Sequence, residues 1–219
     1  MTALHLFDMD GTLLLRSSAS LEIGRRTGHL AAIEEYETAA ASGAMDNLAF
    51  ARSCHPLWQT LTEADIAAAF DAAPWIEGVR DVWADIEARG EHSAVVSMSP
   101  LFFVERLLDW GVGSVHATDV AIGAPLDPGL VLTHQSKAVI AAELCEKYAV
   151  PPDACVAYGD SLSDIALFQA LRNTVAVNGD ERIRSLARLS YQGTDLRAAY
   201  RLARTLLDGP RSDREDGAT

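Results

Sequence analysis

The chain has 219 residues, 49% of them hydrophobic, and a formal net charge of -13 from 18 Lys and Arg against 31 Asp and Glu. This length and composition suffice for one domain with a substantial core and a modest insertion. The acidic balance argues against nucleic acid or an anionic membrane as the main partner. No segment has the apolar length of a membrane span, and the amino terminus lacks a signal-peptide pattern, so we expect a cytoplasmic protein.

Cysteine and histidine carry no metal-site signal. Cys54, Cys145 and Cys155 lack the close spacing of zinc ligands and are odd in number, so we expect small buried side chains rather than a disulfide framework. The six histidines are likewise expected to be structural or surface residues. No pattern in the sequence indicates an oligomeric state.

The first predicted element is a strand over residues 4–7, and two carboxylates follow it. Asp8 and Asp10 are two positions apart, so in extended backbone both face the same point beyond the strand end. Gly11 allows the chain to turn there. Two like charges held close together favour a bound cation between them. The alternative interpretation is an ordinary strand end with turn residues.

Residues 15–74 are predicted to form a helical insertion. Apolar residues recur at three- and four-residue steps, and the expected helices cover 21–25, 30–36, 48–54 and 66–70. Asp46 and Thr62 stand where they would cap the last two helices. About sixty residues of helix are too many for a plain connection between neighbouring strands.

From Gly78 onward, helical periodicity alternates with short apolar runs, as is typical of α/β proteins. The expected strands are 92–96, 114–118, 154–158 and 173–177, and the expected helices are 79–86, 101–110, 137–148, 165–171, 181–189 and 196–207. Residues 120–122 and 130–132 suggest the two arms of a hairpin at the sheet edge. The segment 209–219 is polar and expected to be disordered.

Polar groups follow two of these later strands and open one helix. Ser97 ends one strand, and Pro100 suits the first turn of the next helix, whose free amides would form an anion site. Asp160 ends another strand, with Asp164 one helical turn further on. Lys137, capped by Ser136, lies in a first helical turn, where a cation is unfavourable unless a phosphate or carboxylate compensates it. Simple capping by Ser97 and Asp164, and an exposed Lys137, are the alternative interpretations.

Taken together, the run from Asp8 to Thr12, then Ser97, Lys137 and the Gly159-Asp160 loop with Asp164 resemble the four motifs of the haloacid dehalogenase (HAD) superfamily. The resemblance covers residues from about 4 to about 177. It implies a Rossmann-like three-layer α/β core with a parallel sheet, formed by residues 1–14 and 75–208. Residues 15–74 would be a helical cap over the active site.

The resemblance also implies roles for individual residues. Asp8 would attack phosphorus and form an aspartyl-phosphate, while Asp10 would act as general acid and then general base. Ser97, Met98 and Lys137 would bind the phosphate. Asp8, the main-chain carbonyl of Asp10, and Asp160 would hold Mg²⁺, and Asp164 would orient Lys137 or the waters of the metal. The expected partner is a small-molecule phosphate ester.

Within the superfamily the pattern is similar to that of phosphoserine phosphatases, with four departures. Those enzymes carry an acidic residue shortly after the first motif, where this chain has Arg16-Ser17-Ser18. Met98 and Ser99 stand where they have two glycines, and Ser163 where they commonly have Asn. Arg52 is the candidate for their carboxylate-binding arginine. The departures argue against phosphoserine itself, and a sugar, amino-sugar or specialised-metabolite phosphate is an equal alternative.

Four other functions compete with hydrolysis. A phosphomutase of the same superfamily would keep the motifs but return the phosphate to the substrate. A haloacid dehalogenase is disfavoured because it does not need the second acid, Asp10. A phospho-acceptor signalling module or a non-catalytic binding protein would also pair an Asp with a Lys, but such a module has no use for sixty helical residues after its first strand.

Overall fold

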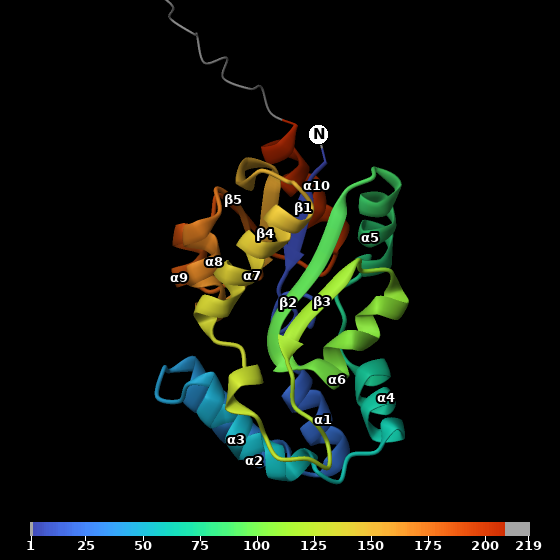
Figure 1. The fold of residues 1–219 in the computed structure, drawn as a ribbon, viewed down its shortest axis with the longest axis vertical. Helices are drawn as coiled ribbons and strands as arrows, with labels where there is room; N and C mark the ends of the chain where they lie inside the picture. The colour runs from blue at the N-terminus through green and yellow to red at the C-terminus, as the bar shows by residue number, and fades with distance from the viewer. Residues whose placement is uncertain (1, 209–219) are drawn as a thin grey trace, which may run out of the picture.

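The computed structural model describes residues 2–208, in which six strands form one entirely parallel sheet (Figure 1). The strands are β1 (Leu4–Phe7), β2 (His92–Pro100), β3 (Ser114–Thr118), β4 (Cys155–Gly159), β5 (Asn173–Val177) and β6 (Leu189–Tyr191). Their order is β3-β2-β1-β4-β5-β6, so the first strand lies in the middle. The predicted α/β class with a parallel sheet is confirmed.

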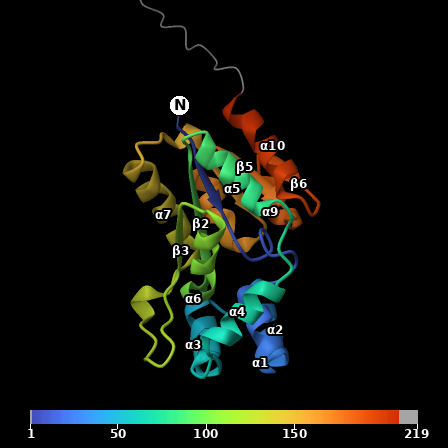
Figure 2. The same ribbon diagram turned by 90° about the vertical axis from the view of Figure 1, so that its right-hand side faces the viewer.

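Helices cover both faces of this sheet (Figure 2). One side carries α5 (Val79–Ala88) and α10 (Leu196–Leu207), and the other α7 (His134–Lys147), α8 (Ile165–Ala170) and α9 (Glu181–Leu186). Alternation along β1 explains the two layers, because Phe7 packs into the first apolar cluster while Leu4 and Leu6 pack into the second. Both faces are therefore apolar, as expected for a parallel sheet.

Within the described chain, the segment between β1 and β2 contains α1 (Ala19–Thr27), α2 (Leu30–Ala41), α3 (Asn47–Trp58), α4 (Glu63–Ala72) and then α5. The predicted caps are present: Asp46 accepts a hydrogen bond from the Ala49 amide at 2.7 Å, and Thr62 forms a capping box with Asp65. We call α1 to α4 the insertion helices. They lie beyond the ends toward which the arrows of β2 and β3 point (Figure 1).

The segment after β2 differs from the prediction. β2 does not end at Val96 but continues through an irregularity in its pairing to Pro100, which pairs with Thr118 of β3. Pro100 is thus the last strand residue and not part of the first helical turn. The helix expected over 101–110 is a short α6 (Leu101–Val104) followed by the 3-10 helix η1 (Glu105–Trp110), a distinction that apolar spacing does not make.

The predicted hairpin over 120–132 is wrong. This segment is a loop containing the 3-10 helix η2 (Pro128–Leu130), and it packs against α3 instead of pairing with itself as two strands. The Gly123 amide donates to Gln59 Oε1 at 3.0 Å, and the His55 ring contacts the Ala124 carbonyl oxygen at 2.9 Å. Val120 joins the apolar cluster of the insertion helices, so its side chain is buried by tertiary contacts and not by a cross-strand partner.

Two further boundaries change. α7 begins at His134 with Thr133 as its N-cap, and Ser136 is the capping-box partner three positions later, not the cap itself. α9 ends at Leu186, and the residues predicted to finish it lead into β6, which pairs with β5. A three-residue strand is too short to show alternation. The 3-10 helices η3 (Pro152–Ala154) and η4 (Leu162–Asp164) flank β4.

The three cysteines are buried and free, as predicted. Of the helices in residues 2–208, none has both the length and the apolar character needed to cross a membrane. The predicted disordered segment 209–219 lies outside the described residues.

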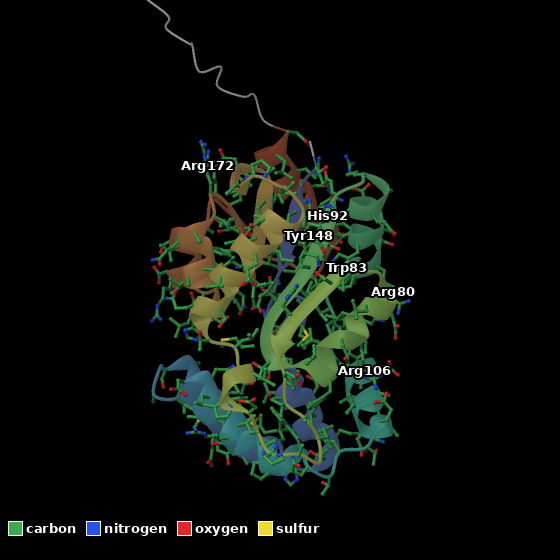
Figure 3. All side chains as sticks on the ribbon, viewed as in Figure 1. Arg80, Trp83, His92, Arg106, Tyr148 and Arg172 are labelled. Carbon is green, nitrogen blue, oxygen red and sulfur yellow. The ribbon has the colours of Figure 1, made fainter. Side chains whose placement is uncertain are left out.

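Trp83 tests the packing between α5 and the sheet. Its side chain lies on α5 in Figure 3, is fully buried and meets the ring of Phe7 edge-on at 6.2 Å between centroids. We expect Trp83→Ala to lower the free energy of unfolding by about 3–5 kcal/mol, because it removes a large core side chain. Chemical denaturation measures the change. Leu186→Ala, at a position 42% exposed, is the control. A comparable loss of stability in both variants would contradict the role of Trp83 as a core residue between α5 and the sheet.

Candidate active site

Strand register brings Asp8 and Asp160 to one edge of the sheet. Phe7 aligns with Val95 of β2 and with Tyr158 of β4. The Asp8 amide continues the ladder by donating to the Tyr158 carbonyl oxygen at 2.9 Å. Asp8 and Asp160 therefore emerge from neighbouring strands at the same carboxyl-terminal edge, where open α/β sheets place their ligands.

Lys137 lies at the centre of this edge. Its side chain is fully buried, and Nζ lies 2.7 Å from Asp8 Oδ1, 2.7 Å from Asp164 Oδ1 and 3.1 Å from Ser163 Oγ. Burial by itself lowers the pKa of a lysine, but the charges of Asp164 and Asp8 outweigh it and raise the pKa of Lys137 above its usual value. The alternative of an exposed lysine is wrong. The first-turn position that the helix dipole disfavours is compensated by carboxylates.

Asp164 connects Lys137 to the loop after β4. Its Oδ2 accepts from the amides of Asp160 at 3.0 Å and Ser161 at 3.4 Å, while Oδ1 holds Lys137. The turn needs Gly159, because a Cβ at that position would lie 2.4 Å from Asp164 Cγ. Asp164 therefore positions both the ammonium group of Lys137 and the backbone amide of Asp160.

Three carboxylates gather around one point. Asp8, Asp160 and Asp164 each offer an oxygen, and these oxygens lie within 4.8 Å of one another. Burial, with the charge of Asp164, raises the pKa of Asp8 to about 7 against the opposing effect of Lys137. Burial and the charge of Asp8 likewise raise the pKa of Asp160 well above its usual range. Three acids facing one lysine leave excess negative charge, and an all-oxygen donor set fits a hard divalent cation.

Asp10 faces away from this cluster, toward the insertion helices. Its Oδ1 accepts from the Ala19 amide at 2.9 Å, and its Oδ2 accepts from the Ser99 hydroxyl. Burial raises the pKa of Asp10, although both hydrogen bonds oppose the shift. Neither partner was predicted for this role. Ser99 was identified only as a residue that replaces a glycine of the similar enzymes, and nothing in the sequence signals the Ala19 amide beyond its place at the start of a helix.

The second motif lies beside Asp10. Ser97 is fully buried, and its Oγ accepts a hydrogen bond from the Ser99 amide at 3.1 Å. Met98 and Ser99 border a cavity of about 90 Å³ between β2 and the insertion helices. The lining consists of Asp10, Ser20, Glu37, Ala40, Asn47, Phe50, Ala51, Trp58, Met98, Ser99, Pro100 and Thr118. Arg52 is exposed and is not among them, so the structure does not bring this candidate to the cavity.

A parallel α/β sheet with a buried Asp–Lys–Asp arrangement at its carboxyl edge defines a class of enzymes that use an acidic, metal-dependent site. The sequence profile of the haloacid dehalogenase-like hydrolases matches residues 5–169. The chain belongs to this family, and the resemblance inferred from its motifs is confirmed.

Individual proteins of known sequence or structure are also similar to this chain. A phosphoserine phosphatase of Idiomarina loihiensis is 24% identical over 200 residues, which cover 89% of this chain and 90% of the relative. A substrate-bound phosphoserine phosphatase has a TM-score of 0.80 at 20% identity, with 92% of this chain and 98% of the other covered. A HAD-family hydrolase of Salmonella enterica serovar Typhi has a TM-score of 0.79 at 20% identity, with 91% and 72% covered. The structural likenesses establish the shared fold.

Gly11 allows a direct test of the acidic site. It has φ of +75°, and a Cβ there would lie 2.1 Å from Asp160 Oδ2. We expect Mg²⁺ to raise the melting temperature of the unmodified protein, and we expect Gly11→Ala to displace Asp160 and so to reduce that rise. Backbone strain alone costs about 1–2 kcal/mol at such a position.

Gly43→Ala is the matched control, because its φ is +77° and nothing lies within 4 Å of the added Cβ. It should carry the strain but keep the full Mg²⁺ response. Equal Mg²⁺ responses in the two alanine variants would show that Asp160 does not take part in cation binding.

Proposed function

We propose that the protein is a Mg²⁺-dependent phosphatase that hydrolyses a small phosphomonoester through an aspartyl-phosphate on Asp8. The observation that carries this proposal is the position of Asp8, hydrogen-bonded in the β1–β4 ladder and paired with Lys137 at 2.7 Å. Asp10 borders the adjoining cavity. The fold is shared with a structure described as a phospho-aspartyl intermediate analogue of phosphoserine phosphatase, with a TM-score of 0.78 and 21% identity.

The two acids have different tasks in this scheme. A carboxylate oxygen of Asp8 attacks phosphorus, and the bond from phosphorus to the leaving oxygen breaks. Asp10, whose pKa is raised by burial, donates its proton to that leaving oxygen. It then takes a proton from the water that attacks the aspartyl-phosphate, which releases phosphate and restores Asp8. Ser99 and the Ala19 amide hold the Asp10 carboxyl group in place throughout.

Charge stabilisation is the larger requirement, since phosphoryl transfer depends mainly on positioning and on neutralising the phosphoryl oxygens. Lys137 offers one positive charge to both the nucleophile and the phosphate, with Asp164 fixing its Nζ. Ser97 and the Met98 amide are assigned to further phosphate oxygens. Asp8, Asp160 and the main-chain carbonyl of Asp10 would hold Mg²⁺, which would supply additional positive charge.

We assign residues 15–74 as a cap domain and residues 1–14 and 75–208 as the catalytic core. The hydrogen bond from Ala19 of α1 to Asp10 supports this division, because it places the start of the insertion helices at the site. So does the cavity, whose lining combines residues of α2 and α3 with residues of β2. In this arrangement the cap excludes water from the reacting phosphate and selects the leaving group.

Replacing the nucleophile tests the reaction. We expect Asp8→Asn to reduce phosphate release from p-nitrophenyl phosphate by at least about a thousandfold, because an amide does not form the covalent intermediate. Asp153→Asn, an exposed acid before β4, should retain full activity. Turnover by the Asp8→Asn protein at the normal rate would refute the nucleophile assignment. Failure of the unmodified protein to release free phosphate from any ester would favour the mutase or non-catalytic alternatives.

Metal removal tests the cofactor. Treatment with EDTA should abolish phosphate release, and added Mg²⁺ should restore it, because three clustered acids against one lysine leave the phosphate site without enough positive charge. Phosphate release is measured before and after readdition of the metal, with far-UV circular dichroism as the control for folding. Undiminished activity in EDTA would contradict the cofactor assignment.

A further inference from the structure

The cavity beside Asp10 is small. Its volume is about 90 Å³, less than the roughly 150 Å³ of an engineered cavity that binds benzene. It therefore accommodates only a few non-hydrogen atoms. Since Asp10 borders it, the group that occupies the cavity is the leaving group of the substrate, next to the acid assigned to protonate it.

The charged residues on the cavity wall are all acidic. Asp10 and Glu37 supply carboxyl groups, and no lysine or arginine stands among the lining residues in the described chain. Arg52, the predicted partner of a substrate carboxylate, is exposed outside it. A leaving group with its own carboxylate would meet like charges there without a compensating cation.

Glu37, on α2, is the acid that the mechanism does not use. Its Oε1 accepts from the hydroxyl of Ser18, which itself caps α1 by accepting from the Leu21 amide at 3.2 Å. Within residues 2–208 it forms no salt bridge, whereas the nearby buried Glu22 pairs with Arg25. Burial raises the pKa of Glu37 to about 7. The Glu37 side chain is only partly exposed to water. A carboxylate withdrawn from water without a cation is unfavourable, and a cation in the cavity would remove this penalty.

Two aromatic side chains also line the cavity, beside neutral residues such as Asn47 and Thr118. Phe50 and Trp58, both on α3, border the same cavity as Glu37. Trp58 is only 2% exposed. Aromatic faces attract alkylammonium groups, most strongly where water is excluded. Acidic and aromatic lining without basic residues is the chemistry that recognises a compact organic cation.

We propose that Glu37, Phe50 and Trp58 select a leaving group that carries an ammonium and no carboxylate, so that the substrate class is the phosphomonoesters of amino alcohols, such as phosphoethanolamine. This inference rests on the proposed phosphatase function. In the reaction, water and the ester give inorganic phosphate and the free amino alcohol. The ammonium keeps its protons and serves only for recognition.

Substrate comparison is the first test. Phosphate release by the Mg²⁺-loaded protein is measured with phosphoethanolamine, with ethyl phosphate, which lacks the amine, and with phosphoserine, which adds a carboxylate. We expect kcat/KM for phosphoethanolamine to exceed both others by at least about tenfold, since a buried charge pair is lost in one case and a like charge is added in the other. Equal values, or a preference for phosphoserine, would overturn the inference.

Substitutions then locate the selection. Glu37→Gln should lower the ratio of kcat/KM for phosphoethanolamine to that for ethyl phosphate by about tenfold, mainly through KM. Phe50→Leu should lower the same ratio in the same direction. Glu34→Gln, an exposed position on the same helix, is the matched control and should leave the ratio unchanged. Thermal unfolding verifies that each variant folds, and an unchanged ratio in Glu37→Gln would rule out its role.

Binding separates this inference from the proposed function. Calorimetry with the Asp8→Asn protein and Mg²⁺ should show phosphoethanolamine binding at least about tenfold more tightly than ethyl phosphate. Preferential binding without hydrolysis by the unmodified protein would refute the phosphatase and keep the selectivity. Hydrolysis without any preference would refute the selectivity alone. If none of the esters binds or is hydrolysed, both the phosphatase function and the selectivity are refuted.

Discussion

The site depends on one buried lysine held between two carboxylates. Lys137 reaches the end of β1 through Asp8 and the loop after β4 through Asp164, so a single ammonium ties three separate segments together. A charge in such a position is stable only if both partners stay in place. The same contacts therefore stabilise the fold locally and orient the side chain that we propose as the nucleophile.

The insertion helices pack against the edge of the sheet that carries these residues. Asn47 at the start of α3 brings its Nδ2 within 2.8 Å of the Leu132 carbonyl oxygen and 3.3 Å of Thr118 Oγ1. The apolar cluster that contains Phe7 continues without interruption into the insertion, where it includes Ile33 and Trp58. Hydrogen bonds and apolar packing thus hold the insertion against the strand ends, which encloses the space next to Asp10.

The acids of the protein divide into groups with different environments. The cluster of Asp8, Asp160 and Asp164 faces Lys137, Asp10 faces neutral donors, and Glu37 faces a hydroxyl and a cavity. Burial raises the pKa of Asp8, of Asp10 and of Glu37, but the compensating partners differ. This difference would allow similar carboxyl groups to take the proposed roles of nucleophile, proton donor and recognition element.

Sequence alone determined the sheet strands that carry the motifs, four of the helical segments before β2, and the four acidic and basic positions that meet at the site. These follow from local rules, because apolar periodicity reports burial and parallel strands present their carboxyl ends at one edge. Met98 borders the cavity and Ser97 accepts a hydrogen bond from the Ser99 amide, but phosphate binding by these two residues stays a prediction.

Only the tertiary structure decided how those residues are used. The loop over 120–132 was predicted as a hairpin because its apolar side chains resemble strand residues, but Leu130 is exposed and the Ala124 carbonyl oxygen contacts the His55 ring of α3. Ser99 comes to Asp10 from a distant part of the chain, and the Ala19 amide from the helix that follows the motif. Glu37 reaches the cavity while Arg52 does not. Contacts of this kind depend on how the helices are oriented over the sheet, and that orientation is set by long-range packing, which local sequence patterns do not encode.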